Sequence, residues 1–313
     1  MLFRSHLWHH PTGYRYFIDD LARDIADSGH NIVGTIFVEC KSMYRAEGPE
    51  QMRSVGETEF AAGQGAIADS HKYTKSRIAA GIVANADPTM GSALAAVLDA
   101  HLDAGNGRLR GIRQRAKWDA DPAVKGAVSA DAPGLYLQPA FQEGLREVAK
   151  RGLIFEASIY HPQLPDVVAL ARAIPELEIV LVHSGSPVGH SSYRGREHEV
   201  HATWLDGIRE LATCPNARIK LGGLLMTLAN FDFGTAMRPP TSAELAELWR
   251  PFIEPCFEVF GPDRCMVSSN FPVDKRGFGY GTVWNMFKRL LSGCSDAERT
   301  TILSGTASAV YRV

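Results

Sequence analysis

The sequence contains little cysteine and no paired cysteine motif. The five cysteines, Cys40, Cys214, Cys256, Cys265 and Cys294, form no C-x-x-C pair. This pattern argues against a zinc–thiolate site and a disulfide framework, and it is typical of a reduced cytosolic chain. No apolar run is long enough to span a bilayer, and the N-terminus lacks an apolar stretch of signal-peptide length. We therefore predict a cytoplasmic location and no membrane partner.

A strong charge of either sign is also missing. The formal net charge is −2, and no block of lysine and arginine occurs. This balance argues against nucleic acid as a partner. No G-x-G-x-x-G follows a predicted strand, so the usual dinucleotide-binding fingerprint is missing. We predict a small molecule as the partner and leave a homo-oligomer open.

The chain does contain a regular alternation of short apolar segments and amphipathic segments. The apolar segments predict strands at 2–8, 32–38, 78–83, 109–112, 153–159, 179–182, 217–221 and 265–267. Helical periodicity is found at 19–28, 94–102, 141–150, 167–174, 200–212, 245–260, 284–291 and 296–310. Strands that alternate with helices favour a parallel sheet. Eight such units in 313 residues favour an α/β fold of the (β/α)8 TIM-barrel type, with one domain over 1–313.

In such a barrel, the polar residues that follow each strand point into one shared mouth. His183 ends the fully apolar strand at 179–182 and precedes Ser184 and Gly185. A histidine in this position suits proton transfer or metal ligation near neutral pH. The alternative is a histidine whose ring is satisfied within the core. We favour the catalytic interpretation because of the position at the strand end.

Two further strands end in charged residues, Glu39 and Arg113. A guanidinium in the mouth suits bidentate capture of a substrate carboxylate. The alternative for Arg113 is an ion pair that closes the barrel rim, and both interpretations stay open. Glu39 is included among the predicted substrate-binding residues.

The turn after the strand at 153–159 contains Tyr160, His161 and Gln163. We predict that these side chains bind substrate, with helix capping as the alternative. The eighth strand is followed by Asn270 and Asp274. Asp274 could act as a general base for water, or it could pair with a neighbouring cation. A lone lysine such as Lys220 more often forms an ion pair than a Schiff base.

The order and spacing of several motifs resemble the amidohydrolase-related (type 2) family, in its branch of lactonases and decarboxylases. The motifs are SHLW at 5–8, VHSG at 182–185, KLGGL at 220–224, FGPDRCM at 260–266, SNFP at 269–272 and SGTA at 304–307. The resemblance covers nearly the whole chain and implies a (β/α)8 barrel, often with one divalent metal such as zinc or manganese. It also leaves open that the first strand is truncated at Met1.

The resemblance assigns His6 and His183 as metal ligands, but two expected ligands are replaced. The family's first-strand pattern Asp-Xaa-His-Xaa-His falls on Leu2, Arg4 and His6, so only the last histidine matches. The aspartate that the family carries after its eighth strand falls on Asn270. A metal held by two imidazoles alone would bind weakly, so metal-free operation is also consistent with the sequence.

From these residues we expect a hydrolase that opens a small carboxylated lactone or a related cyclic ester or amide. Arg113 would hold the carboxylate, His183 or Asp274 would activate water, and Asn270 or His161 would polarise the carbonyl. One alternative is a metal-dependent decarboxylase or hydratase of an unsaturated ring-cleavage acid. A second alternative is a catalytically impaired barrel that only binds a small acid.

Overall fold

A single parallel sheet of eight strands organises the protein in the computed structural model, which describes residues 2–9, 15–124, 130–228 and 238–313. The strands, in sheet order, are β1 (Leu2–Ser5), β4 (Gly34–Val38), β5 (Arg77–Ala84), β6 (Leu109–Arg115), β7 (Ile154–Ser158), β8 (Ile179–Leu181), β9 (Ala217–Leu221) and β10 (Cys265–Val267). Each of the eight predicted strands is present. Because all ladder pairs are parallel, the carboxyl ends of the strands share one face.

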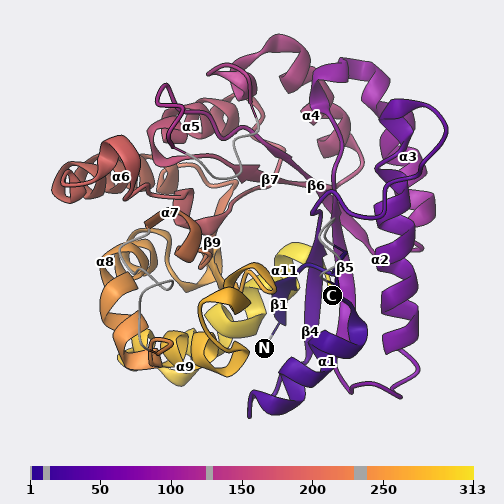
Figure 1. Cartoon of the computed structure of the whole chain (residues 1–313). Coiled ribbons are helices and arrows are strands. Elements are labelled where there is room, and N and C mark those ends of the chain that lie inside the picture. The colour runs from indigo at the N-terminus through magenta and orange to yellow at the C-terminus, as the bar shows by residue number, and fades with distance from the viewer. Residues whose placement is uncertain (1, 10–14, 125–129, 229–237) are drawn as a thin grey trace.

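The sheet is curled, and its labelled strands from β1 to β9 run around a common centre (Figure 1). Directly after β1, the backbone N–H of His6 donates to the carbonyl of Phe271, 2.9 Å away in the segment after β10. A short antiparallel ribbon, β2 (Trp8–His9) with β3 (Arg15–Tyr16), follows β1. The predicted barrel is therefore confirmed, and its first and last strands meet where the polar residues were expected to lie.

Most of the helices surround the sheet on its outer side (Figure 1). The helices of the described segments are α1 (Ile18–Asp27), α2 (Val55–Ala68), α3 (Leu94–Ala104), α4 (Pro139–Lys150), α5 (Leu164–Ala173), α6 (Glu197–Ala212), α7 (Leu225–Leu228), α8 (Ser242–Phe260), α9 (Tyr280–Leu290), α10 (Asp296–Thr300) and α11 (Thr306–Tyr311). Short 3-10 turns are η1 (Glu50–Met52), η2 (Pro88–Ala93), η3 (Leu135–Leu137), η4 (His161–Gln163), η5 (His183–Gly185), η6 (Ser191–Tyr193), η7 (Pro262–Arg264) and η8 (Val273–Arg276), and η9 (Thr301–Gly305) is a π-helical turn.

The two largest apolar clusters among the described residues lie outside and inside the sheet. The larger cluster lies between the strands and the helices and includes Phe37, Ile112 and Trp204. The smaller cluster joins inward-facing residues of the strands, such as Val38 and Val180, to Ala307, Val310 and Tyr311 of the C-terminal segment. Helix α11 thus packs against the inner face of the barrel. No helix among the described residues has the length and apolar character needed to cross a membrane.

Helix α2 is the main element that the sequence periodicity did not indicate. The segment contains Gly56, Gly63 and Gly65, and glycine disfavours a helix interior. Tertiary packing outweighs that preference: a Cβ at Gly56 would lie only 2.6 Å from the carbonyl oxygen of Met43. The helix approaches its neighbouring loop so closely that this position requires glycine. The predicted closing helix at 296–310 is also present, but the π-helical turn η9 interrupts it.

Candidate active site

His183 lies at the carboxyl end of β8, where the sequence placed it. Its side chain is buried, and its Nδ1 lies 3.3 Å from the carbonyl oxygen of Gly222 in the segment after β9. A carbonyl oxygen only accepts hydrogen bonds, so this contact assigns the proton to Nδ1 and leaves Nε2 as the basic nitrogen. The turn after β8 therefore presents an imidazole that is oriented by its partner on the next strand.

The glycine pair after β9 makes room for this imidazole. A Cβ at Gly223 would overlap Nδ1 of His183, and a Cβ at Gly222 would overlap the carbonyl oxygen of Ser268. Both glycines also have positive φ angles, +123° at Gly222 and +69° at Gly223. The KLGGL motif therefore has a steric explanation: any larger residue at 223 would displace the ring of His183.

Replacing Gly223 with alanine is expected to lower turnover together with stability. Gly107 has a φ of +75°, and no atom lies within 4 Å of the position that a Cβ would take there. It is the matched control, because alanine at 107 adds backbone strain without a clash. We expect each variant to lose about 1 kcal/mol of unfolding free energy from the left-handed backbone. Only Gly223→Ala should lose activity as well. Urea unfolding and steady-state kinetics measure both, and equal activity of the two variants would contradict the proposed steric role.

Asn270 and Asp274 form a buried pair in the segment after β10. The Nδ2 atom of Asn270 donates to Oδ1 of Asp274 over 2.8 Å, and both residues are almost fully buried. His6 joins this region through its backbone bond to Phe271, and its own Nδ1 lies 2.5 Å from the carbonyl oxygen of Val38. The structure thus brings three of the sequence-predicted residues to the junction of the first and last strands.

The residues predicted to hold a metal do not fit a tetrahedral or octahedral site. His6 and His183 each bind a backbone carbonyl through Nδ1, a geometry that places the ring lone pair on Nε2, the nitrogen that would act as a ligand. A stable site needs at least one more histidine, cysteine or carboxylate, and no group of three such side chains gathers anywhere in the described segments. Asn270 stands where the family aspartate is expected. The metal predicted for His6 and His183 stays a prediction that this donor set does not favour.

Glu39 and Arg113 form a buried ion pair across the mouth. Arg113 donates from Nε to Oε1 of Glu39 over 2.6 Å and from Nη2 to the Glu39 carbonyl oxygen over 2.5 Å. Arg115 binds both carboxylate oxygens of Glu39, at 3.1 and 3.2 Å. Burial alone would raise the pKa of Glu39, but the two guanidinium groups outweigh it and lower that pKa. The structure therefore contains the rim ion pair that was the alternative for Arg113.

A second buried carboxyl group, Glu57 of α2, lies behind this ion pair. Its Oε1 accepts hydrogen bonds from the backbone N–H groups of Cys40 and Ser42, at 2.9 and 2.8 Å. Burial, and then the negative charge of Glu39, raise the pKa of Glu57 to about 7. Sequence reasoning missed this residue because its helix was not predicted.

The raised pKa of Glu57 predicts how stability depends on pH. The folded protein keeps the Glu57 proton up to about pH 7, whereas the unfolded chain releases it near its ordinary pKa of 4.5. This contribution to stability is therefore complete at low pH and is lost as the pH rises to 7. Between pH 5 and pH 8, the free energy of unfolding of the wild type should fall by at most about 3 kcal/mol relative to that of Glu57→Gln, as measured by urea unfolding. If the difference in unfolding free energy between wild type and Glu57→Gln stays constant with pH, the raised pKa of Glu57 is contradicted.

Lys220 and Glu156 form an ion pair inside the barrel. The Lys220 Nζ lies 2.5 Å from Oε1 of Glu156, and the hydroxyl of Tyr311 donates to the same oxygen over 2.6 Å. All three side chains are buried. The ion-pair interpretation of Lys220 is confirmed, and the pair joins β7 and β9 to the C-terminal helix.

The turn after β7 contains Tyr160, His161 and Gln163, and these residues make different contacts. The Oε1 atom of Gln163 accepts a hydrogen bond from the backbone N–H of Tyr160, so the side-chain amide stabilises the turn. His161 accepts from the backbone N–H of Val188 at Nδ1 over 3.4 Å, and its ring packs edge-on against Tyr193. Burial lowers the pKa of His161 to about 4, which keeps the imidazole neutral with its proton on Nε2.

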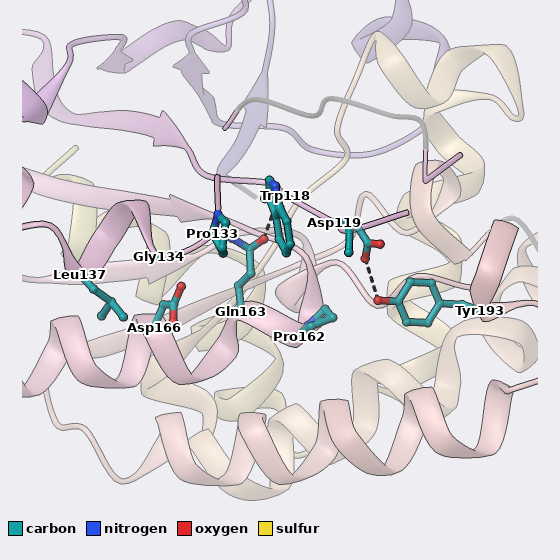
Figure 2. A pocket seen from close by; sticks show the side chains of 10 residues that line it. Trp118, Asp119, Pro133, Gly134, Leu137, Pro162, Gln163, Asp166 and Tyr193 are labelled. Atoms are coloured by element: carbon teal, nitrogen blue, oxygen red, sulfur yellow. Dashed lines mark hydrogen bonds between the residues drawn. The ribbon is translucent and has the colours of Figure 1, made fainter. Parts of the chain in front are cut away.

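A cleft of 460 Å³ opens beside this turn (Figure 2). Gln163, Trp118 and Asp166 line it, and Tyr193 closes one end by donating its hydroxyl to Asp119 over 2.7 Å. Figure 2 shows that these side chains come from the segment after β6, from the start of α5 and from the segment before α6. The cleft is thus formed by connections that follow β6, β7 and β8.

Comparison with known proteins gives the family. The amidohydrolase family model matches residues 5–313, so the chain belongs to the amidohydrolase family. An uncharacterized protein of Sinorhizobium fredii is 30% identical over 98% of this chain and 96% of its own length. An L-fucono-1,5-lactonase of Burkholderia multivorans is 28% identical over 65% of this chain and 63% of its own length.

Solved structures confirm the fold. An amidohydrolase of Burkholderia multivorans with bound zinc has a TM-score of 0.75 and 22% identity, covering 99% of this chain and 98% of that one. A putative 2-pyrone-4,6-dicarboxylic acid hydrolase of Pseudomonas putida has a TM-score of 0.64 and 17% identity, covering 99% and 97%. The resemblance seen in the motifs is therefore confirmed, and a divalent metal occurs in a structural neighbour.

Proposed function

We propose that the protein hydrolyses a small lactone that carries a carboxylate. The main support is the His183 imidazole, which is buried at the carboxyl end of β8 and binds a carbonyl through Nδ1. This geometry makes Nε2 the nitrogen that can remove a proton from water in the mouth. The water oxygen attacks the lactone carbonyl carbon, the ring C–O bond breaks, and the ring oxygen takes a proton to give a hydroxy acid.

The other predicted residues support this reaction from neighbouring strands. Asp274 is an alternative base, because Asn270 fixes its carboxylate through a 2.8 Å hydrogen bond. Arg113 would hold the substrate carboxylate: in the described part of the chain its Nη1 has no hydrogen-bond partner, while Nε and Nη2 bind Glu39. Neutral His161 or Asn270 would donate to the carbonyl oxygen. The lactonase relative supports the same class of reaction.

A lactone panel tests the proposal. L-fucono-1,5-lactone and 2-pyrone-4,6-dicarboxylate, a neutral and a carboxylated lactone, are incubated with the purified protein, and acid release is followed with a pH indicator. We expect Asp274→Asn to lower kcat roughly 100-fold if its carboxylate is the base. Asp206→Asn, on an exposed face of α6, is the control and should behave as wild type. Absence of ring opening across the panel would favour a barrel that only binds a small acid. A cytoplasmic location and a homo-oligomer stay predictions.

A further inference from the structure

The segment that carries His183 has an unusual backbone. Four successive residues have positive φ angles: +55° at His183, +51° at Ser184, +73° at Gly185 and +47° at Ser186. The N–H of Gly185 donates to the carbonyl of Val182 over 3.1 Å, and the N–H of Ser186 donates to that of His183 over 2.8 Å. Two overlapping turns therefore form, and both central residues of each turn have a positive φ, as a type I′ turn requires.

The residue types in this turn do not by themselves favour its conformation. Glycine adopts the left-handed region freely, and type I′ turns otherwise favour asparagine and aspartate. Three of the four residues here are histidine or serine, whose Cβ atoms disfavour that region. A backbone held in a sparsely populated region persists only where the surrounding structure determines it. The contacts that hold this turn are therefore part of what orients the His183 imidazole.

One such contact comes from Trp204 of α6. The Nε1 atom of its indole donates to the carbonyl oxygen of Ser184 over 2.6 Å. The N–H of the same peptide group belongs to Gly185 and donates to Val182, so the plane of this peptide is fixed at both ends. A rotation of the peptide would break both hydrogen bonds and would move His183, which directly precedes it in the chain.

Trp204 is itself held in place by its neighbours. Its side chain is fully buried, and the ring of Phe252 from α8 packs edge-on against it with centroids 5.1 Å apart. The ring of His201 packs against the same indole at 5.6 Å. The backbone N–H of His161 binds the other end of the turn, donating to the carbonyl of Ser186 over 3.3 Å. The turn is thus anchored between α6 and the segment after β7.

We propose that Trp204 is a positioning residue that holds the left-handed turn at 183–186 and thereby keeps Nε2 of His183 as the basic nitrogen of the site. This inference rests on the proposed lactone hydrolysis for its effect on turnover, but the orientation of the ring can be measured without a substrate. The Gly222 carbonyl fixes the ring through Nδ1, and the indole fixes the backbone that carries the ring. Loss of the indole N–H removes a donor from the buried carbonyl of Ser184, so the peptide can rotate toward another partner.

Nitrogen NMR of the histidine side chains tests the orientation of the ring without turnover. At mildly alkaline pH, wild type should show His183 protonated at Nδ1, and the loss of this signal in His183→Asn assigns it. Trp204→Phe removes the donor and should move the signal toward a mixture of the two tautomers. Benzothienylalanine at position 204 replaces only the indole N–H with sulfur and keeps the size of the ring. It should have the same effect, and it serves as the test if Trp204→Phe does not fold.

Ser76→Ala is the matched control for the lost hydrogen bond. The buried hydroxyl of Ser76 donates to the backbone carbonyl of Ile32, just before β5 and β4. This contact lies at the amino ends of the parallel strands, opposite the turn that carries His183. The variant also removes a buried donor from a backbone carbonyl. It should therefore lose stability as Trp204→Phe does, but leave the His183 signal in place.

Kinetics separate this inference from the proposed function. Trp204→Phe should lower kcat for lactone opening roughly tenfold to a hundredfold and leave KM within about threefold, because a misplaced base slows proton transfer without changing how substrate binds. Ser76→Ala should keep the wild-type kcat. A His183 signal that moves in Trp204→Phe, in a protein that opens no lactone, would refute the hydrolase and retain the positioning role. That role is overturned if wild type lacks the Nδ1-protonated form, if the signal stays in place without the indole N–H, or if KM suffers as much as kcat.

Discussion

Replacing His183 with asparagine is expected to lower kcat for lactone opening roughly 100- to 10,000-fold, the usual contribution of a general base. Nε2 of the imidazole is the atom that would accept the water proton, and asparagine offers no base in its place. Folding should survive, because His183 has a φ of +55° and asparagine tolerates the left-handed region well. Steady-state kinetics on the best lactone of the panel and thermal unfolding measure the two effects.

His71 provides a matched control for this variant. It has the same φ of +55°, but it is exposed in the loop after α2. His71→Asn should therefore leave both kcat and the melting temperature unchanged. If His183→Asn turns over lactone at the wild-type rate, the imidazole is not the base, and the reduced kcat of Asp274→Asn would then identify the carboxylate instead.

Replacing Glu39 with glutamine is expected to reduce the free energy of unfolding by about 3–5 kcal/mol. The carboxylate binds the guanidinium groups of Arg113 and Arg115, and the side chains of Glu39 and Arg113 are 0% and 3% exposed. Removing one charge from a buried pair leaves the other without compensation in a medium of low dielectric constant. Urea unfolding at pH 7 measures the loss.

An exposed ion pair supplies the control for the Glu39 variant. Glu59 binds Arg45 near the start of α2, and both side chains are more than 40% exposed. Solvent screens such a pair, so Glu59→Gln should leave the unfolding midpoint unchanged. If Glu39→Gln loses no more unfolding free energy than Glu59→Gln, the ion pair of Glu39 is solvated and does not stabilise the barrel rim.

Residues of the candidate site could be predicted from the sequence only where the local apolar pattern fixes their position at the end of a strand. The apolar strand at 179–182 placed His183 at a strand end, because a continuous apolar run is what a strand covered on both faces requires. The same reasoning placed Asn270 and Asp274 after the last strand.

Contacts between distant segments could not be predicted. Glu39 and Arg113 are separated by 74 positions, and nothing local distinguishes a guanidinium that binds substrate from one that binds a carboxylate. Helix α2 was missed for a related reason, since its glycines disfavour a helix by themselves, and the requirement for Gly56 comes from the close approach of the loop at Met43. The predicted role of Gln163 in substrate binding likewise did not anticipate its hydrogen bond from the backbone N–H of Tyr160.

The sequence by itself determined the order of strands and helices, the barrel class and the set of polar residues at the mouth. These follow from periodicity, which acts over a few residues and is readable without coordinates. The tertiary structure decided which charges pair, which imidazole nitrogen stays basic, and which buried carboxyl group has a raised pKa. Such properties depend on distance and desolvation between segments far apart in the chain, and these exist only once the barrel has closed.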